Sequence, residues 1–230
     1  DWADTSNGGN VAQSDGGDML FLAGNQITKL DHEIEKYDET TGELVAWVEV
    51  RSLSSSTDTD IYIYYGNADA VDQRNPTGAG VWEPNYVGVW HLSETSDQHY
   101  DSTWNSNDSS QVSVTTQGSA TGRIDGADDF TESSSNQITI GDSSSLDITD
   151  AITIEAWINP GTLSDKHRIV TKVDEKYVLR SYWGDHLEAY IDKGGTLKYA
   201  RKADIISTGH QYVAFTWDGV SGDNNLMLYY

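Results

Sequence analysis

The densest group of possible ligand atoms in the sequence lies between residues 101 and 108. Asp101, Asn105, Asn107 and Asp108 place four oxygen-bearing side chains within eight residues. Calcium prefers about six to eight oxygen ligands from flexible loops rich in Asp and Asn, so this segment is a candidate calcium site. Asp and Asn side chains also hydrogen-bond to their own backbone in turns, and this second interpretation needs no ion. The spacing does not match an EF-hand, and no other cofactor is indicated.

The same segment contains a possible modification site. Asn107-Asp108-Ser109 has the form of an N-glycosylation acceptor. One interpretation is an exposed loop glycosylated at Asn107, and the other is a chance occurrence of a short motif.

Aromatic and polar residues gather around a glycine-containing turn near residue 184. They are Tyr182, Trp183, Asp185, His186 and Tyr190. Aromatic faces stack on the C–H bonds of sugars, while neighbouring carboxylates hydrogen-bond to hydroxyl groups, so the group predicts a carbohydrate-binding surface. Aromatic side chains of β proteins also serve as core residues and cross-strand pairs, and that alternative stays open.

No set of residues indicates catalysis. Glu155 alternates with aliphatic neighbours and therefore faces away from the predicted core. Glycosidases need a second carboxylate about 5 to 9 Å away, and this strand offers none. The six histidines are scattered, without the spacing of a zinc site, and no nucleophile elbow or phosphate-binding loop is present. We expect a non-catalytic protein.

The elements that would position these residues are β-strands. Apolar and polar residues alternate with a period of two, whereas no segment of ten or more residues keeps a helical period. Turn-forming clusters of Gly, Asn, Asp and Ser separate the alternating runs. The predicted strands are residues 44–50, 61–65, 152–158, 187–191 and 213–217. The chain is therefore expected to be all-β.

Composition narrows the possible partners. The 230 residues include 37 Asp and Glu against 14 Lys and Arg, a formal net charge of -23. Such a surface repels phosphate, which disfavours binding to nucleic acid or anionic lipid, and it is typical of halophilic proteins or of a calcium-rich extracellular setting. Cysteine is absent, so disulfides and Cys-ligated zinc are excluded. No apolar run is long enough to insert into a membrane.

The chain is expected to have two domains. A polar stretch between Gly66 and Pro84 follows the strand at 61–65 and predicts a small β domain at 1–80 and a larger one at 81–230. Because the chain starts at Asp1 and ends inside a predicted strand, we expect a segment of a longer polypeptide whose second domain lacks its C-terminal edge.

The first domain resembles domain-of-unknown-function family 2341. The likeness is carried by Leu-Asp-His-Glu-Ile-Glu-Lys-Tyr-Asp from residue 30, by Trp-Val-Glu-Val from residue 47, and by Tyr-Tyr-Gly-Asn at 64–67. Members of that family commonly precede a laminin-G-like jelly roll in archaeal and bacterial surface proteins, so the resemblance implies the same order here.

The second domain resembles that laminin-G-like, concanavalin A-like jelly roll. The matching text is Val-Trp-His-Leu-Ser-Glu from residue 89, Asp-Ser-Thr-Trp-Asn-Ser-Asn-Asp from residue 101, Gly-Ala-Asp-Asp-Phe from residue 126, and the strands at 152–158 and 213–217. The resemblance implies two curved antiparallel sheets whose rim loops are free to bind ions or sugars. Trp104, Ser106 and Ser109 stand where the family's loop usually has glycines.

These observations lead to one expected function and two alternatives. We expect a non-catalytic extracellular or cell-surface protein for adhesion, assembly or carbohydrate recognition, with glycans, other surface proteins or copies of itself as partners. One alternative is a spike, turret or tail-fibre component of an archaeal virion. The other is a carbohydrate-active enzyme or its accessory binding module.

Overall fold

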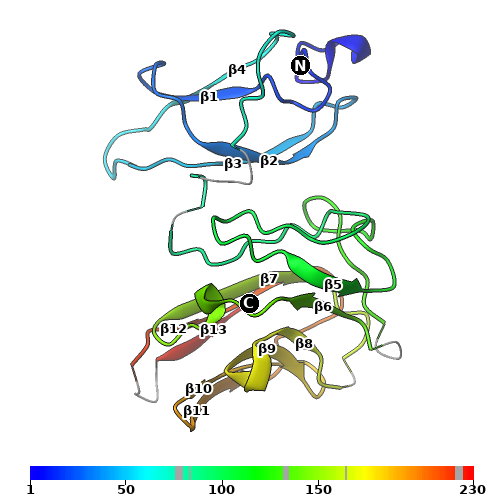
Figure 1. The fold of residues 1–230 in the computed structure, drawn as a ribbon, viewed down its shortest axis with the longest axis vertical. Helices are drawn as coiled ribbons and strands as arrows, with labels where there is room; N and C mark the ends of the chain where they lie inside the picture. Colours follow the sequence, from blue (N-terminus) through cyan, green and yellow to red (C-terminus); the bar gives the residue numbers. More distant parts are fainter. Residues whose placement is uncertain (76–79, 83, 132–134, 164, 221–224) are drawn as a thin grey trace. The chain divides into compact units, whose positions relative to one another are not determined.

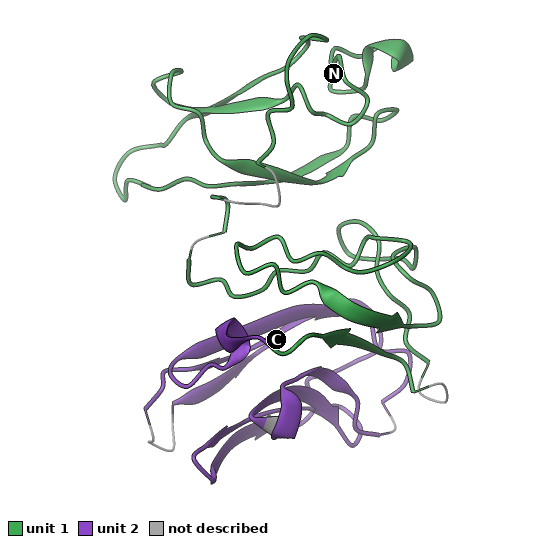
Figure 2. Ribbon diagram, viewed as in Figure 1, with its two compact units in different colours: residues 1–142 green, residues 143–230 purple. Residues whose placement is uncertain are grey.

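The computed structural model describes residues 1–75, 80–82, 84–131, 135–163, 165–220 and 225–230. In that part of the chain the regular elements are antiparallel strands and short 3-10 turns (Figure 1), which confirms the all-β prediction. None of the described helical turns is long or apolar enough to cross a membrane. The chain divides into two compact units, Asp1–Asp142 and Ser143–Tyr230 (Figure 2).

The first unit is built from three strand pairs. They are β1 (Leu20–Ala23) with β4 (Ile61–Tyr64), β2 (His32–Tyr37) with β3 (Leu44–Val48), and β5 (Ser109–Ser113) with β6 (Gln137–Ile140). The strands expected at 44–50 and 61–65 are confirmed as β3 and β4. A bulge between Ile34 and Lys36 leaves Glu35 without an opposite residue on β3. Glu33 and Glu35 still share one face of β2 and reach the same pocket.

A buried carboxylate organises the start of this unit. Asp18 is 3% exposed and accepts hydrogen bonds from the backbone N–H groups of Ala12, Gln13, Gly66 and Asn67. Gly66 has a φ of 95°, a left-handed conformation that side chains disfavour. The Gly-Asn pair that follows β4 therefore closes the strand onto Asp18, which explains why glycine is needed there.

The second unit is a sandwich of two antiparallel sheets (Figure 1). One sheet has the order β13-β12-β7, formed by Leu226–Tyr229, Gln211–Trp217 and Ile152–Ile158. The other has the order β11-β10-β9-β8, formed by Thr196–Lys202, His186–Lys193, Tyr177–Tyr182 and Arg168–Thr171. The strands expected at 152–158, 187–191 and 213–217 are confirmed as β7, β10 and β12.

The core of the second unit combines residues of both sheets. Leu179 and Leu187 from one sheet and Val213 and Phe215 from the other are fully buried and belong to one apolar cluster. Because side chains alternate along a strand, the residues between them face the opposite side of each sheet. On β10 that opposite side carries His186, Glu188 and Tyr190.

The boundary predicted at residue 80 remains a prediction. The compact units meet at residue 142, which groups residues 81–142 with the first unit. Within the segment that suggested the boundary, residues 76–79 and 83 lie outside the described part of the chain.

Candidate functional site

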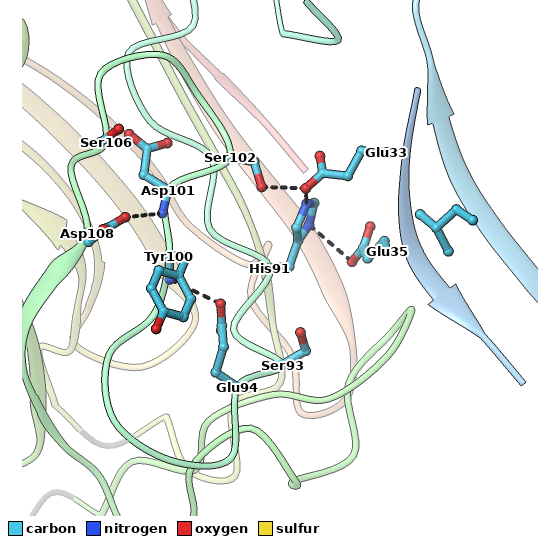
Figure 3. Close-up of a pocket in the computed structure, with 11 residues that line it drawn as sticks. Glu33, Glu35, His91, Ser93, Glu94, Tyr100, Asp101, Ser102, Ser106 and Asp108 are labelled. Carbon is cyan, nitrogen blue, oxygen red and sulfur yellow. Dashed lines mark hydrogen bonds and ion pairs between the residues drawn. The ribbon is translucent and has the colours of Figure 1, made fainter. Parts of the chain in front are cut away.

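The first unit contains a pocket of about 300 Å³ lined mainly by carboxylates and hydroxyl groups (Figure 3). β2 contributes Glu33 and Glu35, and residues 91–108 contribute the other polar side chains. Five carboxylates line the pocket, namely those of Glu33, Glu35, Glu94, Asp101 and Asp108. A pocket of this composition attracts cations and repels anions.

His91 lies between two of these carboxylates. Its Nε2 is 3.3 Å from Glu33 Oε1, and its Nδ1 is 3.4 Å from Glu35 Oε1. Tryptophan N–H groups hold both glutamates, with Trp82 Nε1 donating to Glu33 at 2.8 Å and Trp47 Nε1 to Glu35 at 2.6 Å. Ser102 donates a further hydrogen bond of 2.6 Å to Glu33. Glu33 and Glu35 of β2, each held by a tryptophan N–H, therefore position the His91 imidazole.

The surroundings of His91 determine its charge. Burial alone would lower the pKa of His91, but the hydrogen bonds and negative charges of Glu33 and Glu35 outweigh burial and raise this pKa to about 9. Burial would likewise raise the pKa of Glu33, yet its contacts with His91, Ser102 and Trp82 lower it. At neutral pH the pocket thus holds the His91 imidazolium beside the ionised Glu33 carboxylate.

A second histidine next to the pocket has a similar arrangement. His99 is fully buried, with Nδ1 2.7 Å from Glu94 Oε2 and Nε2 2.8 Å from Asp128 Oδ2. The backbone N–H groups of Tyr100 and Gly118 occupy the other oxygens of the two carboxylates. The two ring nitrogens of His99 therefore bridge the carboxylates of Glu94 and Asp128 within the loop framework.

Asp101, the first residue of the predicted calcium site, is occupied by its own loop. It is 3% exposed, and Oδ1 accepts hydrogen bonds from the N–H groups of Val89 and Thr103, both at 2.9 Å. Oδ2 accepts from Thr103 Oγ1 and from the N–H of Asn107, also at 2.9 Å. Four N–H and O–H donors aimed at one carboxylate leave no lone pair directed at a cation.

The other predicted ligands are also engaged within this loop. Asp108 accepts from the N–H of Asp101 at 2.8 Å, and the Asn105 amide donates to the carbonyls of Tyr86 and Val87. Across the described residues, His, Asp and Glu side chains form no group of three arranged to hold a metal. These residues do not fit a calcium ion in this arrangement, which supports the turn interpretation. Removal of divalent ions tests the calcium prediction directly.

Asn107, the predicted glycosylation site, is not exposed. Its side chain is 6% exposed, and Nδ2 donates a 2.7 Å hydrogen bond to the Val87 carbonyl. Because Nδ2 is the atom that would carry a glycan, modification would have to precede folding. Nearby Ser106 has a φ of 50°, a left-handed backbone conformation that glycine adopts more readily than serine.

The predicted carbohydrate site lies at the hairpin between β9 and β10. Trp183 is 59% exposed and has a φ of 39°, a costly conformation for a bulky residue. Its ring stacks beside Tyr182 with centroids 6.0 Å apart and an interplanar angle of 23°. The ammonium group of Lys166 lies 4.6 Å from the Tyr182 centroid and 5.0 Å from that of Trp183. The hairpin thus presents an aromatic pair together with a cation.

The remaining residues of this predicted site have structural partners. Asp185 is 3.2 Å from His186 Nδ1, and its carbonyl accepts the N–H groups of Ile205 and Ile206. A backbone hydrogen bond from Asp204 lowers the pKa of the Asp185 carboxyl. Tyr190 is 5% exposed beneath the Arg180 guanidinium, 5.0 Å from its ring centroid. Tyr182, His186 and Tyr190 therefore project from one face of the β8–β11 sheet, whereas Trp183 and Asp185 lie in the hairpin turn. Trp183 is the most exposed aromatic residue of the five.

Glu155 faces away from the core, as predicted. Tyr212 Oη donates a 2.5 Å hydrogen bond to it, and the rings of Tyr212 and Trp157 are 5.4 Å apart. The cross-strand neighbours along β12 are Tyr212, Ala214 and Thr216, so the paired strand supplies no second carboxylate. This arrangement does not resemble the carboxylate pair of a glycosidase.

Sequence reasoning missed the residues around His91. The alternation Glu33-Ile34-Glu35 is visible as a strand with an acidic face, but its partner His91 is far along the chain. No short-range signal connects them, because the contact depends on tertiary folding. It likewise missed that Glu188 lies between two arginines: Arg180 Nε donates to it at 2.7 Å and Arg201 Nε at 2.6 Å.

Two known families match this chain, in the order along the sequence that the resemblance implied. Residues 15–107 match a domain of unknown function, DUF2341, and residues 130–230 match the concanavalin A-like lectin/glucanases superfamily. The first match includes every pocket-lining residue except Asp108. Searches of curated proteins and of solved structures gave no match. The two matches therefore stand in the order that the sequence predicts, with the DUF2341 match before the concanavalin A-like match.

Proposed function

We propose that this chain is a non-catalytic extracellular surface protein that recognises carbohydrates through its concanavalin A-like domain. The observation that carries the proposal is the exposed Trp183 at the β9–β10 hairpin, stacked beside Tyr182 in a strained backbone conformation. An exposed tryptophan stacked beside a tyrosine offers an apolar surface for the C–H face of a sugar ring. The domain's lectin-type family supports the same class of ligand.

The proposal is tested by screening the protein against immobilised oligosaccharides and measuring the affinity of the best ligand. Trp183→Ala should weaken binding about tenfold, since stacking on an aromatic ring contributes roughly 1 kcal/mol or more. The matched control is Trp104→Ala, which removes a tryptophan that is 67% exposed in the first unit. Equal losses in the two variants, or no binding to any saccharide, would contradict the proposal.

The non-catalytic part of the proposal has its own test. Reducing-sugar release from the bound oligosaccharides should stay at the level of a blank. Turnover that disappears in Glu155→Gln would instead identify an enzyme in which Glu155 is the catalytic carboxylate.

A further inference from the structure

The charges of this protein are unevenly distributed along its length. Residues 1–142 contain 25 Asp and Glu against 5 Lys and Arg, whereas residues 143–230 contain 12 against 9. All nine of these basic residues lie within residues 166–202, which contain only five acidic ones. The β8–β11 sheet and its loops therefore carry a net positive charge in a protein of net charge -23.

The cations are concentrated in a row that crosses this sheet. Strand register places Arg168 of β8, Arg180 of β9, Glu188 of β10 and Arg201 of β11 opposite one another. Residues directly opposite one another project from the same face of a sheet, so the row combines three guanidinium groups with one carboxylate. Glu188 is 2% exposed and pairs with both Arg180 and Arg201. One carboxylate cannot neutralise both partners, so positive charge remains on this face.

Cationic side chains also lie against the aromatic pair, Tyr182 and Trp183, at the β9–β10 hairpin. The Arg201 guanidinium carbon lies 3.7 Å from the centroid of Tyr182, and the Lys166 ammonium approaches Tyr182 and Trp183 together. The side chain of Arg201 is 37% exposed and that of Arg180 is 16% exposed, so Arg201 is the more accessible guanidinium. Among the described residues, Lys166 has no recorded ion pair.

We propose that the surface formed by Lys166, Arg201, Tyr182 and Trp183 at the β9–β10 hairpin binds saccharides that carry carboxylate or sulfate groups. This inference rests on the carbohydrate recognition proposed above and specifies its ligand. The sugar ring stacks on Trp183, and its anionic group contacts the Lys166 ammonium and the Arg201 guanidinium, whose planar N–H pairs match carboxylate and sulfate oxygens. Neutral saccharides gain only the stacking contribution.

Because the protein as a whole is negatively charged, a preference for anionic ligands must come from cations close to the bound ligand. At physiological ionic strength the Debye length is about 8 Å, so exposed charges farther than this from a bound ligand act on it only weakly. Direct contacts with Lys166 and Arg201 are not screened in the same way. The preference for anionic ligands should therefore depend on these two side chains and not on the net charge of the protein.

The test uses dextran, carboxymethyl-dextran and dextran sulfate of matched length, which share one backbone and differ in charge. Dissociation constants are measured by calorimetry at physiological ionic strength for the whole chain. The anionic forms should bind about tenfold more tightly than dextran, as one charge-assisted contact contributes roughly 1.4 kcal/mol. The ratio between the carboxymethyl and sulfate forms identifies which anion the site accepts.

Two charge reversals and one aromatic variant separate the possible results. Lys166→Glu should abolish the preference for anionic dextrans and leave dextran binding intact, whereas Trp183→Ala should weaken all three ligands. Lys29→Glu is the control, because it makes the same change in net charge at an exposed position of the first unit. Circular dichroism and melting curves confirm that each variant folds.

The other possible results each contradict a specific part of the proposal. Equal binding of neutral and anionic dextrans, with no effect of Lys166→Glu, overturns the anionic selectivity but leaves carbohydrate recognition standing. Equal losses in Lys166→Glu and Lys29→Glu show a non-specific charge effect and overturn the site. If no dextran and no arrayed saccharide binds, the proposed function fails as well. If light scattering shows self-association that Lys166→Glu abolishes, without saccharide binding, the face docks a second copy instead.

Discussion

The protonation state of His91 depends on two glutamates that approach it from a neighbouring strand. Its pKa is raised to about 9, whereas an unfolded histidine titrates near its ordinary value of 6.5. A raised pKa means that the folded state binds the proton more tightly, so the stabilisation is fully present below pH 6.5 and is lost as the pH rises through 9. The loss is at most about 3 kcal/mol, at 1.36 kcal/mol per pKa unit.

We predict that the free energy of unfolding falls between pH 6.5 and pH 9.5 and that His91→Gln removes most of this dependence. The measurement is urea unfolding followed by tryptophan fluorescence at half-unit pH intervals. His210→Gln is the control, because it makes the same substitution at an exposed histidine outside the pocket. A profile in His91→Gln as steep as that of the parent would show that His91 is not held as an imidazolium.

Glu188 combines deep burial with two cationic partners. Replacing it by Gln keeps the shape of the side chain but leaves Arg180 and Arg201 facing each other without a counter-charge. We predict that Glu188→Gln lowers the free energy of unfolding by about 3 kcal/mol, as for other broken buried ion pairs. Denaturant unfolding measures the loss.

The matched control for this prediction is Glu155→Gln. Glu155 lies exposed on the outer face of the opposite sheet, and the same substitution there should change the free energy of unfolding by less than about 0.5 kcal/mol. Equal effects at the two positions would mean that the Arg–Glu–Arg contacts contribute nothing specific.

At the scale of elements, the segment 101–108 shows how a loop can be ordered without a metal. Asp101 accepts four hydrogen bonds from within unit 1, so removing divalent ions with EDTA at constant ionic strength should leave the melting temperature unchanged. Asp101→Asn should lower the free energy of unfolding by about 2 kcal/mol, because the new N–H₂ group would face existing donors. A fall of several degrees on EDTA treatment would assign loop oxygens to calcium.

Several strands were predictable and others were not, for a physical reason. β7 and β12 alternate large apolar residues with exposed ones, which makes their period of two easy to recognise. β9 carries a buried valine, Val178, between core residues Tyr177 and Leu179, and its outward face holds Arg180, so its alternation is weak. β2 has an acidic face and a bulge, which together conceal the pattern.

At the scale of the whole molecule, charge repulsion opposes the compact state. The net charge of -23 comes mostly from residues 1–142, where acidic residues outnumber basic ones by 25 to 5. Raising NaCl from 0.1 M to 1 M shortens the Debye length from about 10 Å to about 3 Å and should raise the melting temperature by several degrees. Differential scanning calorimetry across this salt range checks the prediction.

The control for the salt effect is the same titration at pH 4, where many carboxylates are protonated and the repulsion is smaller. The rise in melting temperature with salt should then be reduced. An equal rise at both pH values would point to a general salting-out effect instead of charge screening.

The all-β class, the five alternating strands and the acidic surface could be predicted from the sequence alone. These properties are local or additive: alternation is visible within one strand, and net charge is a sum over residues. The sequence also located the aromatic hairpin, because Tyr182, Trp183, Asp185 and His186 are close in sequence.

Contacts between side chains that are distant in sequence became known only from the folded structure. It placed His91 between Glu33 and Glu35, directed four donors at Asp101, buried Asn107 and aligned Arg168, Arg180, Glu188 and Arg201 across four strands. Such contacts depend on strand register and on the paths of the loops. A shift of one residue in the register would turn every side chain of a strand to the opposite face of the sheet. The aromatic hairpin could thus be located from the sequence, whereas the cations beside it required the register of the β8–β11 sheet.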